Sequence, residues 1–251
     1  MDERYKLIDV RGEGSFGVVY RAFDRSRLRD VAVKFSKSPD LEARKELENE
    51  AMLLNLLQNE FIVDLLDEGI HSEEPYIVTE YCDVGSLRRW IGQVHWSIVV
   101  SILSQVVQGL QCIHDAGAVH CDIKPENLLL KSTIDNSVVV KIADFGIAYA
   151  VGQESARTNT SKGTRGYIAQ EVLEGKPLAA AADIYSLGIV ATELLTGARE
   201  PGHLTMANVP SDLCTLVVAM TNRYPEYRPP LREIGEALEA VLPRCCVFPN
   251  V

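Results

Sequence analysis

The stretch His120 to Leu130 reads HCDIKPENLLL and guides the interpretation of the whole chain. A polar turn before a strand is its simplest explanation, but that does not account for Asp122, Lys124 and Asn127 at these intervals. Each of these three side chains suits a particular chemical role. Asp122 would accept or orient a hydroxyl proton, Lys124 would neutralise a phosphoryl group in transfer, and Asn127 would bind magnesium. The spacing therefore indicates a candidate site for phosphoryl transfer.

A second polar motif, Asp144-Phe145-Gly146, follows an apolar segment over 138–142 that is typical of a buried strand. A carboxylate at the end of such a strand supplies the hard oxygen ligand that Mg²⁺ prefers. The tripeptide has little weight alone. Together with Asn127, it predicts a metal site formed by Asn127 and Asp144 that takes Mg²⁺, with Mn²⁺ as an alternative.

Residues 12–19, GEGSFGVV, place Gly12, Gly14 and Gly17 in a G-x-G-x-x-G pattern. Glycine lets a backbone approach phosphate closely and adopt turns that side chains prevent. An ordinary glycine-rich turn between two strands has the same appearance, so the pattern is weak alone. A dinucleotide-binding fold requires a helix directly after the last glycine, and the β-branched and aromatic residues found there exclude it.

Lys34 ends the apolar segment VAVK, residues 31–34. A lysine at a strand end is often simply solvated. The helix predicted over 40–58 offers acidic partners, and Glu50 lies beside the apolar stripe of that helix rather than opposite it. We therefore expect a Lys34–Glu50 ion pair that fixes the ammonium where it can hold phosphate groups.

The periodicity of apolar residues divides the chain into two parts. In the first part a helix is predicted over 40–58, and strands are predicted over 5–11, 16–23, 30–35, 62–66 and 76–81. After Gly85 the pattern becomes mainly helical, with segments 96–116 and 181–195 each closed by a glycine. This order predicts an α+β fold with two lobes and a hinge at 83–86.

The four motifs occur in the order glycine-rich loop, VAVK, HCDIKPEN and DFG, each in its expected structural context. In this the chain resembles the eukaryotic-like Ser/Thr protein kinase family over nearly its whole length. The resemblance implies a kinase domain over 1–251, with an N-lobe over 1–82, a hinge over 83–86 and a C-lobe over 87–251. It also implies transfer of the γ-phosphoryl group of ATP to hydroxyls of protein substrates, this chain included.

The resemblance further implies roles for individual residues. ATP would be contacted by Gly12, Gly14, Gly17, Val19, Ala32, Lys34, Thr79, Glu80, Cys82 and Leu129. Among these, Val19, Ala32 and Leu129 would enclose adenine, Thr79 would be the gatekeeper, and the backbones of Glu80 and Cys82 would meet its edge. The catalytic set would be Asp122, Lys124, Lys34, Glu50 and Thr164. Magnesium would be held by Asn127 and Asp144.

Two features favour a non-specific serine/threonine kinase over a tyrosine kinase. Lys124 stands two residues after Asp122, and Gly163-Thr164 resembles the pattern in which the threonine bridges Asp122 and Lys124. The resemblance also implies that Glu171 pairs with Arg228 to brace the activation segment. Asp183 would likewise brace the catalytic loop.

Two positions and one stretch of the chain depart from the family pattern. Cys121 replaces an arginine that normally receives a loop phosphate, and a thiol cannot form that charge-assisted pair. The sequence therefore does not predict control through loop phosphorylation, although the loop offers Ser155, Thr158, Thr160 and Ser161 as acceptors. Gln170 replaces a proline, and the stretch between Gly197 and Asp212 predicts a reduced or missing helix. Cys121 is also a candidate for inhibition by oxidation.

The composition restricts the classes of molecule that the protein is expected to bind. A formal charge of −10 argues against nucleic acid and anionic membrane surfaces, because both attract clustered Lys and Arg. No apolar run long enough to predict a membrane-spanning helix occurs. The six cysteines are scattered, which fits free thiols in a cytoplasmic protein. The adjacent Cys245 and Cys246 could form a bond on oxidation, and the oligomeric state is not indicated.

Two rival functions remain. One is a pseudokinase scaffold that binds nucleotide without turnover, although every catalytic residue is present. The other is a small-molecule kinase, a class that shares an H-x-D-x-x-x-x-N-like run but lacks this glycine loop and the framework for holding a peptide.

Overall fold

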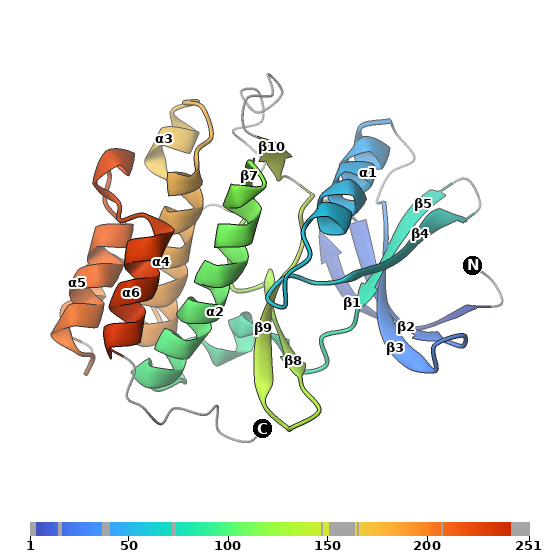
Figure 1. Ribbon diagram of the computed structural model, residues 1–251, viewed down its shortest axis with the longest axis horizontal. Helices are drawn as coiled ribbons and strands as arrows, with labels where there is room; N and C mark the ends of the chain where they lie inside the picture. The colour runs from blue at the N-terminus through green and yellow to red at the C-terminus, as the bar shows by residue number, and fades with distance from the viewer. Residues whose placement is uncertain are drawn as a thin grey trace.

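The computed structural model describes residues 4–14, 17–36, 41–71, 74–146, 148–150, 164, 166–206 and 208–241. The N-terminal region is built on one antiparallel five-stranded sheet of order β1-β2-β3-β5-β4. Its strands are β1 Tyr5–Gly14, β2 Gly17–Asp24, β3 Arg29–Phe35, β4 Leu65–His71 and β5 Glu74–Glu80. Helix α1, Leu41–Leu56, lies beside this sheet (Figure 1).

Helix α1 presents one apolar face to the interior. Residues three and four apart share a face of a helix, so Leu47, Ala51 and Leu54 form the predicted stripe. All three are buried, which confirms that prediction. Glu50 lies at the edge of the stripe and is only 3% exposed, so its carboxylate is held inside the molecule.

The C-terminal region is mainly helical. Its α-helices are α2 Trp96–Asp115, α3 Gln170–Leu173, α4 Ala180–Thr196, α5 Ser211–Met220 and α6 Leu231–Val241. Short 3-10 helices occupy η1 Leu87–Trp90, η3 Pro201–Met206 and η4 Pro225–Tyr227. Gly197, with φ of 77°, ends α4 in the left-handed conformation that glycine adopts without steric cost. An antiparallel sheet followed by helices confirms the predicted α+β class.

Helix α2 is the centre of this helical region. It packs against α4, α6 and β9 (Val138–Ile142), and the three helices lie side by side in Figure 1. Among the described helices, α2 is the one long and apolar enough to cross a membrane, with a mean hydropathy of 1.5. However, 56% of that window is buried inside the molecule. Such burial is typical of the core helix of a packed domain.

Two small sheets complete the described part of the fold. One has the order β6-β8-β9 and joins β6 Gly85–Ser86, β8 Leu128–Ser132 and β9. The other pairs β7 Ala118–Val119 with β10 Tyr149–Ala150. Figure 1 shows the β8–β9 hairpin between the five-stranded sheet and the helices. Because β6 begins at Gly85, the second half of the predicted hinge is paired with β8. The predicted domain boundaries stay a prediction.

The strand predicted over 62–66 is wrong in its first half. Ile62 forms an isolated parallel bridge with Ile142 of β9. The N–H of Ile142 donates to the carbonyl of Phe61 over 2.8 Å, and the N–H of Val63 donates to the carbonyl of Ile142 over 3.0 Å. These backbone groups are committed to β9, so pairing with β5 begins only at Leu65. The junction ties the end of α1 to the β8–β9 hairpin.

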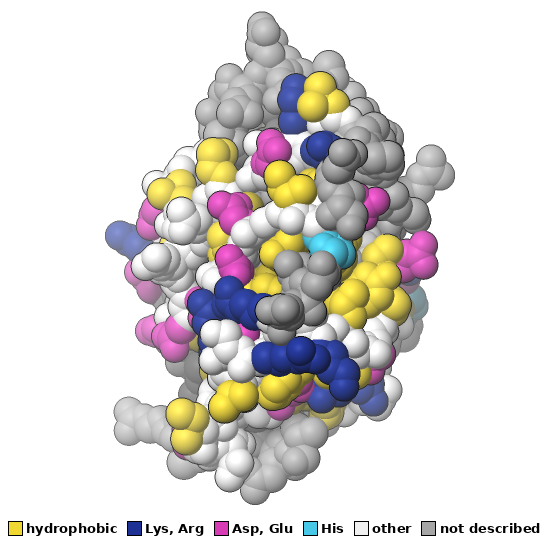
Figure 2. Space-filling view, turned by 90° about the vertical axis from the view of Figure 1, so that its right-hand side faces the viewer, with side chains coloured by type: hydrophobic (Ala, Val, Ile, Leu, Met, Phe, Trp, Pro, Cys, Tyr) yellow, Lys and Arg dark blue, Asp and Glu magenta, His cyan; other side chains and the backbone are white. Residues whose placement is uncertain are grey.

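The surface of the N-terminal sheet is mixed in character. Figure 2 shows the end of the molecule that this sheet forms, where basic, acidic and apolar side chains are interspersed. Exposed apolar side chains include Ile8 and Val10 on β1 and Ile70 on β4. In the C-terminal region, the described part of the stretch between Gly197 and Asp212 contains the six-residue η3 and the first residue of α5.

Candidate active site

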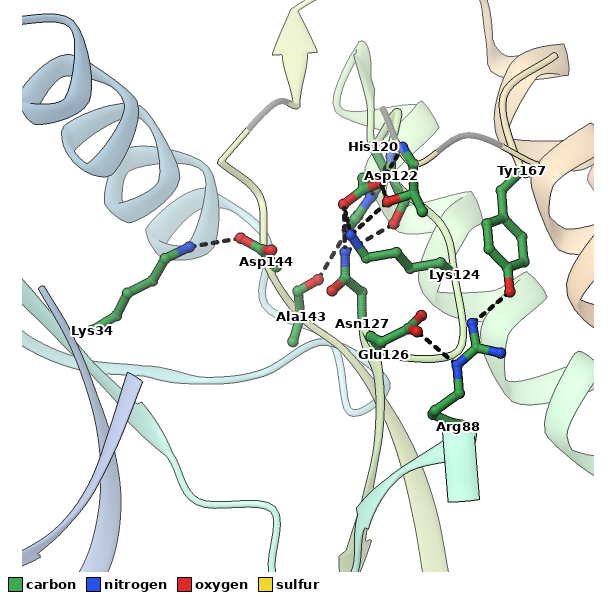
Figure 3. A network of polar contacts seen from close by, with 11 residues as sticks. Lys34, Arg88, His120, Asp122, Lys124, Glu126, Asn127, Ala143, Asp144 and Tyr167 are labelled. Atoms are coloured by element: carbon green, nitrogen blue, oxygen red, sulfur yellow. Dashed lines mark hydrogen bonds and ion pairs between the residues drawn. The ribbon is translucent and has the colours of Figure 1, made fainter. Parts of the chain in front are cut away.

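Three of the five predicted catalytic residues, Asp122, Lys124 and Thr164, meet at the segment that follows β7. Lys124 Nζ lies 2.5 Å from Asp122 Oδ2 and donates to Thr164 Oγ1 over 2.8 Å. The Thr164 hydroxyl donates to Asp122 Oδ1 over 3.0 Å. Asn127 Nδ2 donates to Asp122 Oδ2 over 3.0 Å. Asp122, Lys124 and Asn127 converge in Figure 3. Thr164 thus bridges Asp122 and Lys124, although the sequence separates it from them by about forty residues.

Asp183 anchors the backbone of the segment that contains Asp122. It is fully buried on α4, and its carboxylate accepts from the backbone N–H groups of His120 and Cys121, each over 2.9 Å. His114 Nε2 lies 2.9 Å from the same carboxylate. Burial raises the pKa of Asp183, but the bond with His114 and the other contacts outweigh it and lower that pKa below its ordinary value. The anchored backbone includes Cys121 in the left-handed region, with φ of 67°.

Lys34 lies between two carboxylates, as Figure 3 shows for one of them. Its Nζ is 2.7 Å from Glu50 Oε2 and 2.6 Å from Asp144 Oδ1. Burial opposes the charge on Lys34, but both carboxylates raise its pKa, so the ammonium stays protonated. The expected Lys34–Glu50 pair is therefore present, and the contact with Asp144 connects it to the second predicted metal ligand.

The donor set of Asn127 and Asp144 fits Mg²⁺. The Asn127 amide nitrogen is directed to Asp122, which leaves the amide oxygen for a cation. Asp144 adopts φ of 66°, and its preceding residue Ala143 donates its N–H to the carbonyl of Asn127 over 2.9 Å. Among the described residues, no group of three or more His, Cys, Asp or Glu side chains is arranged to hold a metal ion. Two protein ligands suit Mg²⁺, because this ion keeps several waters and binds substrate phosphates as well.

The residues predicted to enclose adenine lie on two different sheets. Val19 of β2 pairs with Lys34, and Ala32 of β3 pairs with Thr79 of β5. Leu129 lies on β8 and pairs with Ser86. The strands of the sheet and the β8–β9 hairpin therefore carry the two predicted walls of the nucleotide site.

The glycine-rich turn is described at Gly12, Gly14 and Gly17, while Ser15 and Phe16 lie outside the described residues. Gly14 pairs with Gly17 at the tip of the β1–β2 hairpin. Gly17 has φ of 156°, and a Cβ there would lie 2.1 Å from the carbonyl oxygen of Phe35. No other residue fits this position without a shift of the backbone. A Cβ at Gly12 would meet nothing within 4 Å, so packing against the described residues does not require glycine at that position.

Glu171 and Arg228 form the buried pair that the resemblance implied. Arg228 donates from Nη1 to Glu171 Oε1 over 2.5 Å and from Nη2 to Glu171 Oε2 over 2.9 Å. Its Nη1 also donates to the carbonyl of Ala181 at the start of α4. This pair anchors the short helix α3 to the helical region.

The surroundings of the Cys121 thiol disfavour the predicted inhibition by oxidation. Burial, with Asp183 and Asp122 nearby, raises its pKa well above the ordinary value. Its Sγ donates to the carbonyl of Val119 over 3.6 Å. Oxidation proceeds through the thiolate, and a thiol held protonated reacts slowly. The loop acceptors Ser155, Thr158, Thr160 and Ser161 lie outside the described residues, as do Gly163, Cys245 and Cys246.

Comparison with known proteins agrees with this geometry. The sequence matches the family model described as protein kinase domain over residues 5–248. The chain belongs to the protein kinase family. This kinase domain is 36% identical over 201 residues to serine/threonine-protein kinase Pkn1 of Myxococcus xanthus, which covers 77% of the chain and 29% of Pkn1.

Two animal proteins show similar likeness. The kinase domain is 36% identical over 200 residues to calcium/calmodulin-dependent protein kinase type 1 of Caenorhabditis elegans, covering 78% of the chain and 57% of the relative. It is 31% identical over 228 residues to serine/threonine-protein kinase pak-1 of the same organism, covering 90% of the chain and 38% of that relative. The chain spans less than two thirds of each of these relatives.

Sequence reasoning did not predict the polar cluster around Arg88 in the kinase domain. Arg88 of η1 donates to Glu126 over 2.6 Å, to Glu193 over 2.9 Å and to the Tyr167 hydroxyl over 2.6 Å. Figure 3 shows Arg88 between Glu126 and Tyr167, beside the predicted catalytic residues. Tyr167 in turn donates to Glu193. The only signal in the sequence was the basic pair 88–89 after a glycine turn, which does not point to partners as distant as Glu193.

Proposed function

We propose that this kinase domain transfers the γ-phosphoryl group of ATP to Ser and Thr hydroxyls of proteins, including its own. The observation that carries the proposal is the bridge from Thr164 to both Asp122 and Lys124, with distances of 3.0 and 2.8 Å. The Lys34 contacts to Glu50 and Asp144 support it from the other side of the site. Phosphoryl transfer depends mainly on positioning and on electrostatic stabilisation, and both clusters provide these.

In the proposed reaction the substrate hydroxyl approaches Asp122, which accepts its proton. A bond forms between the hydroxyl oxygen and the γ-phosphorus, the bond from that phosphorus to the β,γ-bridging oxygen breaks, and ADP leaves. Lys124 neutralises charge on the phosphoryl group, and Lys34 holds the α- and β-phosphates. Asn127 and Asp144 would hold Mg²⁺, which when bound neutralises phosphate charge.

The nature of the partners is also a proposal. Protein substrates are favoured because relatives that are 36% identical are named as protein kinases and because the Glu171–Arg228 pair braces the segment that a peptide would meet. Between Gly197 and Asp212 the described residues form η3, so we propose a reduced surface for docked proteins there. We also propose a cytoplasmic protein without nucleic acid or membrane partners, divided into lobes over 1–82 and 87–251 by a hinge at 83–86.

Transfer of label from γ-labelled ATP with Mg²⁺ tests the activity. The parent is compared with Asp122→Asn on a generic protein substrate and on the kinase itself, followed by analysis of the labelled amino acids. Asp115→Asn is the control, because the Asp115 side chain is exposed at the end of α2, where it accepts a hydrogen bond from Gln111 over 2.7 Å.

We expect label on Ser or Thr for the parent and the control, and its loss in Asp122→Asn. Nucleotide binding without label in the parent would replace this proposal with a pseudokinase scaffold. Label confined to an added small-molecule alcohol would indicate the small-molecule class.

A further inference from the structure

The side chain of Glu80 is buried in a polar cluster that the adenine prediction did not use. Glu80 is 4% exposed. Its Oε1 lies 2.7 Å from Lys141 Nζ and accepts the backbone N–H of Asp64 over 3.0 Å, while its Oε2 accepts from Lys131 Nζ. Lys141 Nζ also donates to the carbonyl of Ile62 over 3.2 Å. One carboxylate therefore accepts from three donors.

These partners come from separate parts of the fold. Glu80 is the last residue of β5, Lys131 lies on β8, and Lys141 lies on β9. Asp64 follows the junction between α1 and β9, and its carbonyl accepts the N–H of Glu80 over 3.0 Å. The carboxylate thus fastens the five-stranded sheet to the β8–β9 hairpin where the chain leaves that sheet.

The same strands carry the predicted walls of the adenine site. Thr79, directly before Glu80, pairs with Ala32, which is predicted to lie above the ring. Lys141 pairs directly with Leu129, which is predicted to lie below it. A change in the Glu80–Lys141 distance would therefore alter the separation of Ala32 and Leu129.

The polar cluster around Glu80 is held together by the attraction between its carboxylate and two ammonium groups. Burial raises the pKa of Glu80, but bonds from Lys131, Lys141 and the Asp64 N–H outweigh it and lower that pKa below its ordinary value, so the group is ionised at neutral pH. The Lys141 side chain is 8% exposed, whereas that of Lys131 is 34% exposed and can reach water. A buried ammonium that loses its counter-charge is strongly unfavourable, so Lys141 is the partner that responds most to a change at Glu80.

We propose that Glu80 is a positioning residue for the nucleotide, because its carboxylate, through Lys141, sets the separation of the two walls of the adenine site. The inference rests on the proposed function only in taking ATP or ADP as the ligand of the adenine site. It concerns the affinity for nucleotide rather than the chemistry around Asp122, which lies on a different segment.

The test measures the Kd of a fluorescent adenine nucleotide with Mg²⁺ directly, alongside KM for ATP, kcat and Tm. Glu80→Gln keeps the size of the side chain but leaves one acceptor oxygen for three donors. We expect its Kd and KM to rise by about tenfold with kcat changed by less than about twofold, which is the signature of lost uniform binding. Lys141→Met should raise Kd and KM by a similar factor. The double variant of Glu80→Gln and Lys141→Met should lose no more nucleotide affinity than either single variant.

Two further variants test whether the effect is specific to the Glu80–Lys141 contact. Glu174→Gln is a control with the same chemical change, since Glu174 follows α3 in the helical region and pairs with Lys176 at the surface. It should leave Kd unchanged. Lys131→Met should have a smaller effect than Lys141→Met, because its ammonium is partly solvated.

A Kd for Glu80→Gln or Lys141→Met within about twofold of the parent, whatever happens to Tm, overturns the proposal. A rise in Kd that is equal in Glu174→Gln also overturns it, and so does a parent that binds no adenine nucleotide. A parent that binds nucleotide but transfers no label refutes the proposed function alone, because the direct Kd comparison still decides the role of Glu80.

Discussion

Removal of the Glu171 carboxylate is expected to lower the stability of the whole domain. The Arg228 side chain is 0% exposed and that of Glu171 is 8% exposed, and two hydrogen bonds of 2.5 and 2.9 Å join them. In Glu171→Gln the guanidinium keeps its backbone carbonyl acceptors but loses its counter-charge. Breaking a buried pair from one side costs about 3–5 kcal/mol. For a domain of this size that corresponds to a fall in Tm of roughly 6–20 °C.

The assay is thermal unfolding together with urea unfolding at neutral pH. The control is Glu236→Gln, which breaks the exposed Arg232–Glu236 pair and should change the free energy of unfolding by less than about 0.5 kcal/mol. Replacing both buried partners, as Glu171→Leu with Arg228→Met, should recover much of the loss. Equal small shifts for Glu171→Gln and Glu236→Gln would refute the reasoning, since burial would then make no difference.

Three further results are expected. Lys34→Met should lower kcat for label transfer by at least about 100-fold, because both carboxylates lose their cation; a loss below tenfold would contradict the role given to Lys34. Burial raises the pKa of Asp24, but bonds from the Arg4 guanidinium and two backbone N–H groups outweigh it and lower that pKa to about 2. Asp24 should therefore contribute about 2 kcal/mol to stability above pH 5, and this contribution should disappear as the pH falls towards 2. Asp24→Asn should abolish that part of the pH dependence of the free energy of unfolding in urea. An unchanged pH dependence in this variant would exclude the contribution of Asp24. Cys121 should resist iodoacetamide in the native protein and react after unfolding, as read by mass spectrometry, whereas equal rates would show an accessible thiol.

The parts of the site that were predictable from the sequence are those that local geometry determines. Asp122, Lys124 and Asn127 lie within one short segment, so their spacing already brings them together. Glu50 was predictable because the helical period places it at the edge of a buried stripe, facing the strand that carries Lys34. In each case a regular backbone converts positions in the sequence into a direction in space.

The remaining parts depend on how distant elements pack, and no period encodes that. Arg88 meets Glu193 across more than one hundred residues, and the sequence around Arg88 is compatible with a solvated basic pair. The strand predicted over 62–66 failed for the same reason, since Ile62 and Val63 are apolar and suit a strand equally well in either sheet. For Glu80 the resemblance implied a role for the backbone alone, because a carboxylate at a strand end gives no sign in the sequence of its burial.

The end of β9 connects these observations. Ile142 is bonded on both sides to the residues that follow α1, and Lys141 donates to the carbonyl of Ile62 in the same junction. Helix α1 carries Glu50, and Asp144 follows Ile142 by two residues, so this junction fixes the separation of the two carboxylates that Lys34 contacts. A shift of the junction would break one of these pairs. The contacts of Lys34 therefore depend on backbone pairing at β9 as much as on the identity of Glu50 and Asp144.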